Sequence, residues 1–262
     1  MRHPRLSALA IAATVLALGS AAAAPASAAG AHYVALGDSY SSGDGAGSYD
    51  SSAGSCQRSS NAYASKWAAA NAPASFKFVA CAGATTTDLI NSQVASVTSD
   101  TTLVSMTTGG NDVGFSNVME TCVLDSDSTC KSAVATAEST AASVLPGRLA
   151  TLFAKIKAQA PNAHVVVLDY PHLYYITSFC IGLSNTKRTA LNAGADYLDT
   201  VVSKATADAG FTFADVRSRF SGHELCSGDG WLHSITYPIG ESYHPTSTGQ
   251  ISGYLPVFSA AA

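Results

Sequence analysis

Two short segments near opposite ends of the chain contain residue types that can perform covalent acyl transfer. Ser39 belongs to the motif Gly-Asp-Ser-Tyr at residues 37–40, which directly follows an apolar stretch. His244 belongs to Glu-Ser-Tyr-His-Pro at residues 241–245. A serine hydroxyl becomes a good nucleophile when a base removes its proton, and histidine is the side chain best suited to that task near neutral pH. If the fold brings the two together, the chemistry is attack on a carbonyl carbon.

Two further segments contain groups that can stabilise the negative charge developing on such a carbonyl oxygen. Gly83 can expose a backbone N–H, and Asn111 in Gly-Gly-Asn-Asp (residues 109–112) offers a side-chain NH₂. Taken singly, each segment is also typical of an ordinary turn: Ser39 or Asp38 can cap a helix, a glycine can ease a turn, and an asparagine can form an Asx-turn.

The remaining histidines have more ordinary interpretations. His3 lies in a leader segment, His32 and His164 open strands, and His223 lies in the loop around Cys226. His172 follows the fourth strand and His233 also lies in the loop region around Cys226, and we expect these two to be walls of a pocket.

The elements that must position these residues alternate between strands and helices. Five short apolar or β-branched runs predict strands, at His32–Leu36, Phe76–Ala80, Thr102–Thr107, His164–Asp169 and Phe211–Val216. Alanine-rich stretches between them predict helices, at 61–71, 87–97, 132–159 and 185–209. A terminal helix is expected at 246–258, with Thr246 or Ser247 as its N-cap, although Gly249 and Gly253 disfavour it.

This alternation predicts a single-domain, three-layer α/β/α sandwich with a mostly parallel five-stranded sheet. The run Val165–Leu168 has no polar alternation, as expected of a strand buried on both faces. In such sheets the catalytic and ligand-binding residues lie at the carboxyl ends of the strands, and Ser39, Gly83 and Asn111 each follow a predicted strand. The Ser-, Gly- and Asp-rich stretches at 41–60 and 125–129 are expected to be surface loops, with 43–47 as a flexible rim.

Composition excludes several other classes of protein. Of the 262 residues, 12% are charged and 47% hydrophobic, and the net charge is −4, so there is no basic stripe for binding nucleic acid. Residues 1–28 have a positive start, an apolar run and an Ala-Ser-Ala end, which is typical of a secretory signal peptide. We therefore expect an extracellular protein whose domain spans residues 29–262 and which does not insert stably into a membrane.

Six cysteines follow the predicted signal peptide, and an even number in an exported chain indicates disulfides. Six cysteines allow 15 pairings, so the sequence alone does not settle their connectivity. Proximity along the chain favours Cys56–Cys81, Cys122–Cys130 and Cys180–Cys226. The spacing of the cysteines does not suit zinc, so no metal site is expected.

Together and in this order, the four segments resemble the sequence blocks of the SGNH hydrolases, also called the GDSL esterases and lipases. That family carries Gly-Asp-Ser-Leu/Tyr, then a glycine, then Gly-x-Asn-Asp, then a late His-Pro. The corresponding segments here span residues 37 to 245. The resemblance implies a flavodoxin-like α/β fold, catalysis by Ser39 and His244, and an oxyanion hole formed by Ser39, Gly83 and Asn111. It implies no cofactor.

The leader, the six cysteines and Glu-Ser-Tyr-His-Pro-Thr resemble the secreted bacterial lipases and phospholipases A1 of this family. In those proteins neighbouring cysteines are joined in order, which supports the pairing favoured above. The resemblance implies that the protein cleaves carboxylic esters of lipids through an acyl-enzyme. We also expect a monomer that binds no nucleic acid. Asp38 is interpreted as structural.

One position departs from the wider family, which has an aspartate three residues before the catalytic histidine. Here that residue is Glu241. In the lipase branch a backbone carbonyl two residues before the histidine orients it instead, and that residue is Ser242. Both arrangements stay open, and we favour the Ser242 carbonyl.

Three functions are compatible with these residues: a lipid ester hydrolase, a carbohydrate acetyl esterase and a catalytically inactive binding domain. The third is disfavoured because all four blocks are intact. The Gly-x-Ser-x-Gly signature of other lipases, the Walker A motif and HExxH are all absent from the sequence. The absence of an appended carbohydrate-binding domain favours the first function over the second.

Overall fold

The computed structural model describes Met1 and residues 30–262, so the predicted signal peptide, apart from Met1, lies outside the described residues. The described chain forms a five-stranded sheet in the order β2-β1-β3-β4-β5, and every neighbouring pair is parallel. The strands are β1 (His32–Ala35), β2 (Ser75–Phe78), β3 (Leu103–Met106), β4 (His164–Leu168) and β5 (Thr212–Ala214). All five predicted strands are thus confirmed, each shorter than or shifted from its predicted range by one to three residues.

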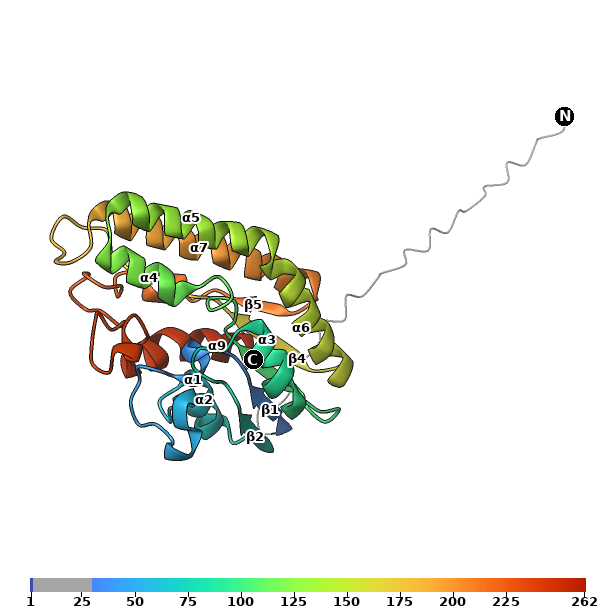
Figure 1. Ribbon diagram of the computed structural model, residues 1–262. Coiled ribbons are helices and arrows are strands. Elements are labelled where there is room, and N and C mark those ends of the chain that lie inside the picture. The colour runs from blue at the N-terminus through green and yellow to red at the C-terminus, as the bar shows by residue number, and fades with distance from the viewer. Residues whose placement is uncertain (2–29) are drawn as a thin grey trace.

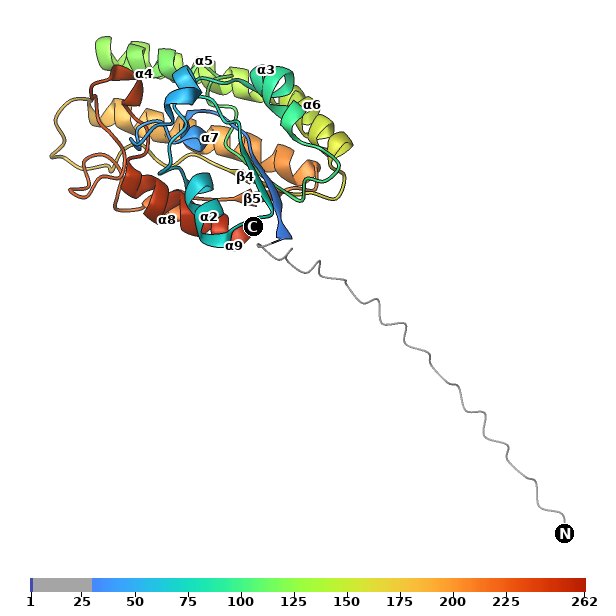
Figure 2. The ribbon, with the colours of Figure 1, turned by 90° about the horizontal axis from the view of Figure 1, so that it is seen from below.

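Helices cover both faces of this sheet, which confirms the predicted sandwich (Figures 1 and 2). On one face lie α2, α8 and α9; on the other lie α3, α6 and α7, with α5 packed against α7. The helices are α1 (Ser39–Ser42), α2 (Tyr63–Asn71), α3 (Thr86–Asp88), α4 (Phe115–Leu124), α5 (Asp127–Ser143), α6 (Leu145–Gln159), α7 (Asn185–Asp208), α8 (Arg217–Phe220) and α9 (Leu255–Ala261).

The burial of each strand follows its place in the sheet. All four residues of β3 are buried, as are the last four of β4, because these strands lie inside the sheet with helices on both faces. The edge strand β2 instead alternates exposed and half-buried residues, with Ser75 and Lys77 exposed. In the register of the sheet, Val34 on β1 lies between Lys77 on β2 and Val104 on β3.

The helix predicted at 132–159 is wrong in two respects. It is two helices, α5 and α6, because Pro146 in the first turn of α6 has no N–H to continue the preceding helix. The first of them also starts earlier, at Asp127, where Ser126 caps it through a hydrogen bond from Thr129 N–H. The segment 125–129 is therefore mostly a helix start rather than a loop. The helix α4 was not predicted at all.

Other helical predictions agree more closely. The ranges 61–71 and 185–209 correspond to α2 and α7. The range 87–97 is helical but irregular, because α3 continues through a π-helical turn at Leu89–Gln93 and a 3₁₀ turn at Val94–Ser96.

The terminal helix exists despite its two glycines. It begins with a π-helical turn at Gly249–Tyr254 and continues as α9, and the Thr246 hydroxyl accepts a hydrogen bond from the Gly249 N–H. Both glycines lie where there is no room for a side chain. A Cβ at Gly249 would be 2.5 Å from the Trp231 carbonyl oxygen, and one at Gly253 would be 2.3 Å from the Phe220 ring.

Gly253→Ala is expected to lower the free energy of unfolding by about 1–3 kcal/mol, because the added methyl group overpacks the fully buried Phe220. The expected fall in Tm is several degrees and is measured by thermal unfolding. Gly147→Ala in α6 is the matched control: no atom lies within 4 Å of the new Cβ, so Tm should stay the same or rise. Equal Tm values for the two variants would contradict the packing argument.

The structure contains three disulfides, at Cys56–Cys81, Cys122–Cys130 and Cys180–Cys226, and residues 30–262 contain no free cysteine. These are the pairs formed when neighbouring cysteines are joined in order. The second fastens α4 to α5 close to the turn between them. Among the described residues, no helix is long and apolar enough to cross a bilayer.

Candidate active site

Ser39 lies at the carboxyl end of β1, as the first residue of the short helix α1. The turn before it requires a glycine: Gly37 has a φ of 120°, and a Cβ there would lie 2.7 Å from the Thr107 carbonyl oxygen. The Gln93 side chain holds this turn through hydrogen bonds to both the N–H and the carbonyl of Gly37. The turn that precedes the nucleophile candidate is thus held in place by the Gln93 side chain.

Asp38 is fully buried, and its carboxylate stabilises the local fold. Its carboxylate caps α1 by accepting from the Tyr40 N–H at 3.0 Å, and it accepts from the hydroxyls of Thr107 and Tyr170. Burial raises the pKa of Asp38 to about 6, while the hydrogen bonds from Thr107 and Tyr170 oppose that rise. These contacts fit the structural interpretation of Asp38 made from the sequence.

His244 comes from a loop at the other end of the chain, and its Nε2 lies 2.7 Å from the Ser39 hydroxyl oxygen. A second link joins the two segments: the Tyr40 hydroxyl donates to the Tyr243 carbonyl at 2.7 Å. Tyr243 has a left-handed backbone with a φ of 66°, which turns the chain so that His244 faces the serine. The structure therefore brings the two residues into hydrogen-bonding contact across 205 positions.

The other ring nitrogen of His244 faces backbone rather than a carboxylate. Its Nδ1 is buried and makes no hydrogen bond within residues 30–262. Burial lowers the pKa of the ring, and the nearby carbonyls of Ser242 and Gly240 oppose that change only in part. The Glu241 carboxylate accepts instead from the Tyr49 hydroxyl at 2.7 Å. That hydroxyl also accepts from the Gly45 N–H, so Glu241 belongs to a network that supports the neighbouring loop.

Candidate oxyanion donors lie on the loops that follow β2 and β3. Gly83 has a left-handed backbone with a φ of 78°, and its N–H, like that of Ser39, donates to no other group in residues 30–262. Asn111 Nδ2 donates to the Ala84 carbonyl at 3.0 Å, which orients its amide and leaves one N–H free. Asp112 ties the same loops together by accepting from the N–H and the hydroxyl of Thr86.

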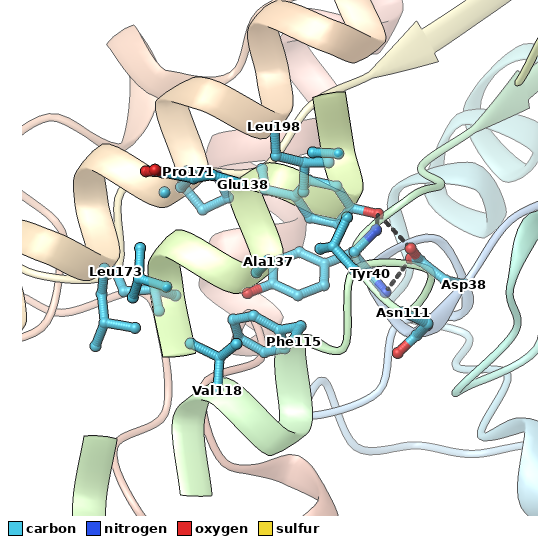
Figure 3. A pocket seen from close by; sticks show the side chains of 18 of the residues that line it. Asp38, Tyr40, Asn111, Phe115, Val118, Ala137, Glu138, Pro171, Leu173 and Leu198 are labelled. Atoms are coloured by element: carbon cyan, nitrogen blue, oxygen red, sulfur yellow. Dashed lines mark hydrogen bonds between the residues drawn. The ribbon is translucent and has the colours of Figure 1, made fainter. Parts of the chain in front are cut away.

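An apolar pocket opens beside Ser39 and Asn111 and extends between α4, α5 and α7 (Figure 3). Its walls are mostly hydrocarbon, from residues that include Phe115, Val118, Val134, Leu173, Leu191 and Leu198. Glu138 is the one charged side chain among the lining residues other than Asp38. This pocket could not be predicted from the sequence, because Phe115 and Val118 in its wall belong to α4, a helix that the sequence did not indicate.

Two histidines expected to line a pocket do not line this one. His172 pairs with Asp196 at 2.9 Å, while its chain neighbours Pro171 and Leu173 face the pocket. His233 Nε2 contacts the Gly45 carbonyl at 2.7 Å. The flexible rim predicted at 43–47 is wrong for most of this segment, because residues 43–46 are buried. Gly45 lies against His244 and Pro245.

The electrostatics of His244 favour a neutral ring. Enclosure by protein atoms lowers its pKa to about 4, and the nearby carbonyls of Ser242 and Gly240 only partly oppose this. A neutral imidazole can accept the serine proton, whereas an imidazolium cannot.

NMR titration of the His244 ring is expected to give a pKa near 4, below the ordinary value of about 6.5. Because the ring loses its function as a base only when it is protonated, activity should persist as the pH falls through 6 and should decline toward 4. The acid limb of kcat/KM for a dissolved ester checks the same point. A ring pKa of 6.5 or above in the folded protein would contradict the prediction.

Comparisons with known proteins agree with this architecture. The sequence profile described as "GDSL-like Lipase/Acylhydrolase family" matches residues 35–250. "Lipase 1" of Streptomyces coelicolor is 55% identical over 223 residues, which is 85% of this chain and 83% of that protein. The crystal structure of phospholipase A1 from Streptomyces albidoflavus has 54% identity and a TM-score of 0.87, covering 89% of this chain and 100% of that one. The extracellular lipase of Streptomyces rimosus has 51% identity and a TM-score of 0.86, covering 88% and 99%.

The matched profile covers most of the chain and includes Ser39, Gly83, Asn111 and His244. On that match and on the identity with these relatives, the chain belongs to the GDSL-like lipase/acylhydrolase family.

Proposed function

We propose that this protein hydrolyses carboxylic esters of lipids through an acyl-enzyme formed on Ser39. The observation that carries the proposal is the 2.7 Å contact between Ser39 Oγ and His244 Nε2 at the mouth of an apolar pocket. The contact supplies a nucleophile with its base. The pocket suits a hydrocarbon chain, because burying apolar surface is favourable in proportion to its area.

In the proposed mechanism Ser39 Oγ attacks the ester carbonyl carbon while His244 Nε2 takes the hydroxyl proton. The oxyanion receives hydrogen bonds from the N–H groups of Ser39 and Gly83 and from the Asn111 amide. Collapse of this intermediate expels the alcohol, which takes the proton from His244. Water then attacks the acyl-enzyme, His244 takes its proton, and the fatty acid leaves as Ser39 is regenerated.

We assign the orientation of His244 to the Ser242 carbonyl rather than to the Glu241 carboxylate. Support comes from the side chain of Glu241, which accepts from the Tyr49 hydroxyl, and from the carbonyls of Ser242 and Gly240 near the ring, which partly oppose the lowering of its pKa by burial. An imidazole Nδ1–H that donates to this carbonyl would leave Nε2 as the acceptor for the serine proton.

The lipid substrate is supported by relatives at 50–55% identity that are named lipases, and by one named phospholipase A1. Secretion of this chain is proposed from the sequence of residues 1–28 and from the three disulfides, which persist in oxidising compartments. We also propose that it acts as a monomer and neither binds nucleic acid nor inserts stably into a membrane.

Active-site labelling combined with a substrate series tests the proposal. A fluorophosphonate should label a single peptide, the one that contains Ser39, and should abolish hydrolysis. Among dissolved p-nitrophenyl esters, kcat/KM should rise from the acetyl to the octanoyl ester as the acyl chain fills the pocket. Phosphatidylcholine with different acyl chains at its two positions would then show which ester bond is cleaved. A preference for acetyl esters would instead support a carbohydrate acetyl esterase.

A further inference from the structure

Large apolar side chains are exposed mainly in two loops, residues 173–184 and residues 231–240. These loops contain seven of the eleven exposed large apolar residues within 30–262: Tyr175, Ile176, Phe179, Ile181, Ile235, Tyr237 and Ile239. Single exposed apolar residues are ordinary, but a concentration in two short segments indicates an interaction surface. Both loops project from the same end of the molecule, in ochre and orange-red in Figure 1.

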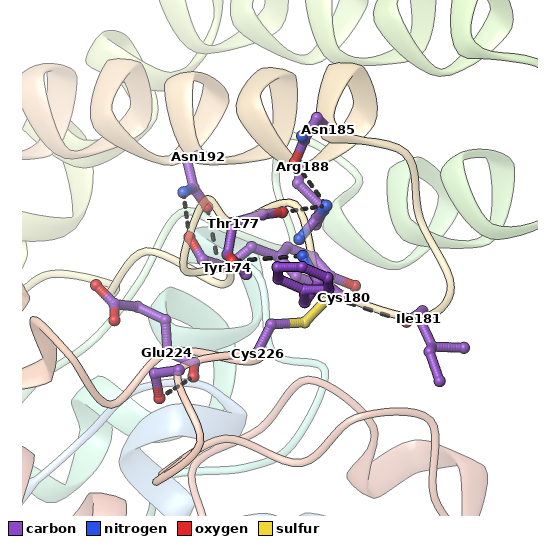
Figure 4. Close-up of a disulfide and its surroundings, with 11 residues drawn as sticks. Tyr174, Thr177, Cys180, Ile181, Asn185, Arg188, Asn192, Glu224 and Cys226 are labelled. Atoms are coloured by element: carbon purple, nitrogen blue, oxygen red, sulfur yellow. Dashed lines mark hydrogen bonds between the residues drawn. A yellow bond between two sulfur atoms is a disulfide. The ribbon is translucent and has the colours of Figure 1, made fainter.

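The 173–184 loop is firmly attached at its base, so its exposed side chains are presented by an anchored loop (Figure 4). Asn192 on α7 accepts from the Tyr174 N–H at 3.1 Å and donates to the Tyr174 carbonyl at 2.7 Å. Cys180 is joined to Cys226. On either side of this cysteine Phe179 is 91% exposed and Ile181 104% exposed, so nothing in the described chain covers them.

The 231–240 loop is anchored in a similar way next to the catalytic histidine. The Thr236 N–H donates to the Ser242 hydroxyl at 3.0 Å, and Leu232 pairs with Pro245. From this base Tyr237 is 94% exposed and Ile239 70% exposed. Only residues 241–243 separate this loop from His244, so the exposed side chains of Tyr237 and Ile239 are held close in the chain to the proposed base.

The 173–184 loop begins at the proposed active site and contacts the segment that leads from the 231–240 loop to His244. Leu173, at the start of the first loop, lines the apolar pocket beside Ser39. The next residue, Tyr174, contacts Tyr243 with ring centroids 6.4 Å apart, immediately before His244. The 173–184 loop therefore runs from the wall of the pocket to the exposed side chains of Tyr175, Ile176, Phe179 and Ile181.

Charge indicates which kind of partner fits this surface. Neither 173–184 nor 231–240 contains an Asp, Glu, Lys or Arg, and the whole chain has a net charge of −4. A protein of this charge is repelled by an anionic surface, and these loops offer no cation to overcome that repulsion. Exposed Tyr, Phe and Ile suit the boundary between headgroups and acyl chains, where amphipathic rings and aliphatic groups are favoured.

We propose that the 173–184 and 231–240 loops form a docking face for zwitterionic phospholipid surfaces, which holds the pocket mouth against its substrate. This inference rests on the proposed hydrolysis of lipid esters. It adds that the protein is recruited to the aggregate by apolar insertion of its loop tips, separately from the binding of one ester molecule at Ser39.

Flotation with vesicles of ether-linked phosphatidylcholine, which has no ester to cleave, tests the docking face. The wild-type protein should bind these vesicles equally in 0.05 M and 0.5 M NaCl, because salt screens charges and not apolar contacts. The double variants Phe179→Ser/Ile181→Ser and Tyr237→Ser/Ile239→Ser should each show a partition coefficient at least tenfold lower, because they remove apolar surface that is buried on insertion.

Val144→Ser is the matched control, because Val144 is an exposed apolar residue between α5 and α6. The junction of these two helices lies away from both loops (Figure 1). It should bind vesicles within twofold of wild type. As a second readout, the rate on ester-linked vesicles divided by the rate on a dissolved ester should fall at least tenfold in each double variant and stay constant in the control.

Three results would overturn the docking face: wild-type protein that does not float with the vesicles, double variants that float like wild type, or a wild-type dimer that the double variants dissociate. The last would show that the loops bind a second copy of the chain. Vesicle binding by wild type without hydrolysis of any dissolved ester would support the docking face and contradict the proposed function.

Discussion

His244→Ala is expected to lower kcat on a dissolved ester by about 10⁴-fold or more. The Ser39 hydroxyl has one partner able to take its proton, His244 Nε2 at 2.7 Å, and without that base the hydroxyl remains a weak nucleophile. Steady-state kinetics on purified, folded variants measures the effect. Ser39→Ala should cause a similar loss, and the double variant should be no worse than either, because the two residues act as a unit.

Glu241→Ala provides the internal comparison for this result. If the Ser242 carbonyl orients the histidine, the variant should keep at least about a tenth of wild-type kcat, since a backbone carbonyl is unaffected by changing its neighbour's side chain. Removal of a true triad acid costs about 10⁴ in kcat. A loss of a thousandfold or more in folded Glu241→Ala would show that Glu241 completes a triad. Under the same assignment Tyr49→Phe, which removes the partner of Glu241 but keeps its carboxylate, should also keep at least about a tenth of wild-type kcat.

Asn111→Ala is expected to lower kcat by about 10²–10³ while changing KM little. Its amide is held by the Ala84 carbonyl so that one N–H remains for an oxyanion, which exists only in the transition state and intermediates. Asn71→Ala is the control, because Asn71 Nδ2 also donates to a backbone carbonyl, that of Trp67, but on the surface helix α2. Full turnover by Asn111→Ala would remove this residue from the proposed oxyanion hole.

The sheet and the positions of the site residues could be predicted because they depend on local sequence. Each strand is a short apolar run, and Ser39, Gly83 and Asn111 each follow one, so the parallel topology gathers them at one edge. Local sequence also predicts export, from the leader segment, and disulfide formation, from the even number of cysteines.

The contacts that position the site residues relative to one another could not be predicted, because each joins a side chain to a backbone group far away in the sequence. The Tyr40 hydroxyl meets the Tyr243 carbonyl across 203 positions, and no property of either residue type specifies that partner. Gly253 disfavours a helix by intrinsic propensity, but packing against Phe220 outweighs that preference. The break between α5 and α6 is a different case, since Pro146 was a usable signal.

The separation of Ser39 and His244 along the chain has a consequence for biosynthesis. A polypeptide grows from its N-terminus, so the nucleophile is made long before the base, which lies 205 residues later. Every shorter product, whether still on the ribosome or cut by a protease before residue 244, has the serine but lacks its proton acceptor. With the proposed pair of Ser39 and His244, hydrolytic activity arises only when the C-terminal loop has been synthesised and has docked beside α1, so we expect partial chains to be unable to attack lipids in the cell that makes them.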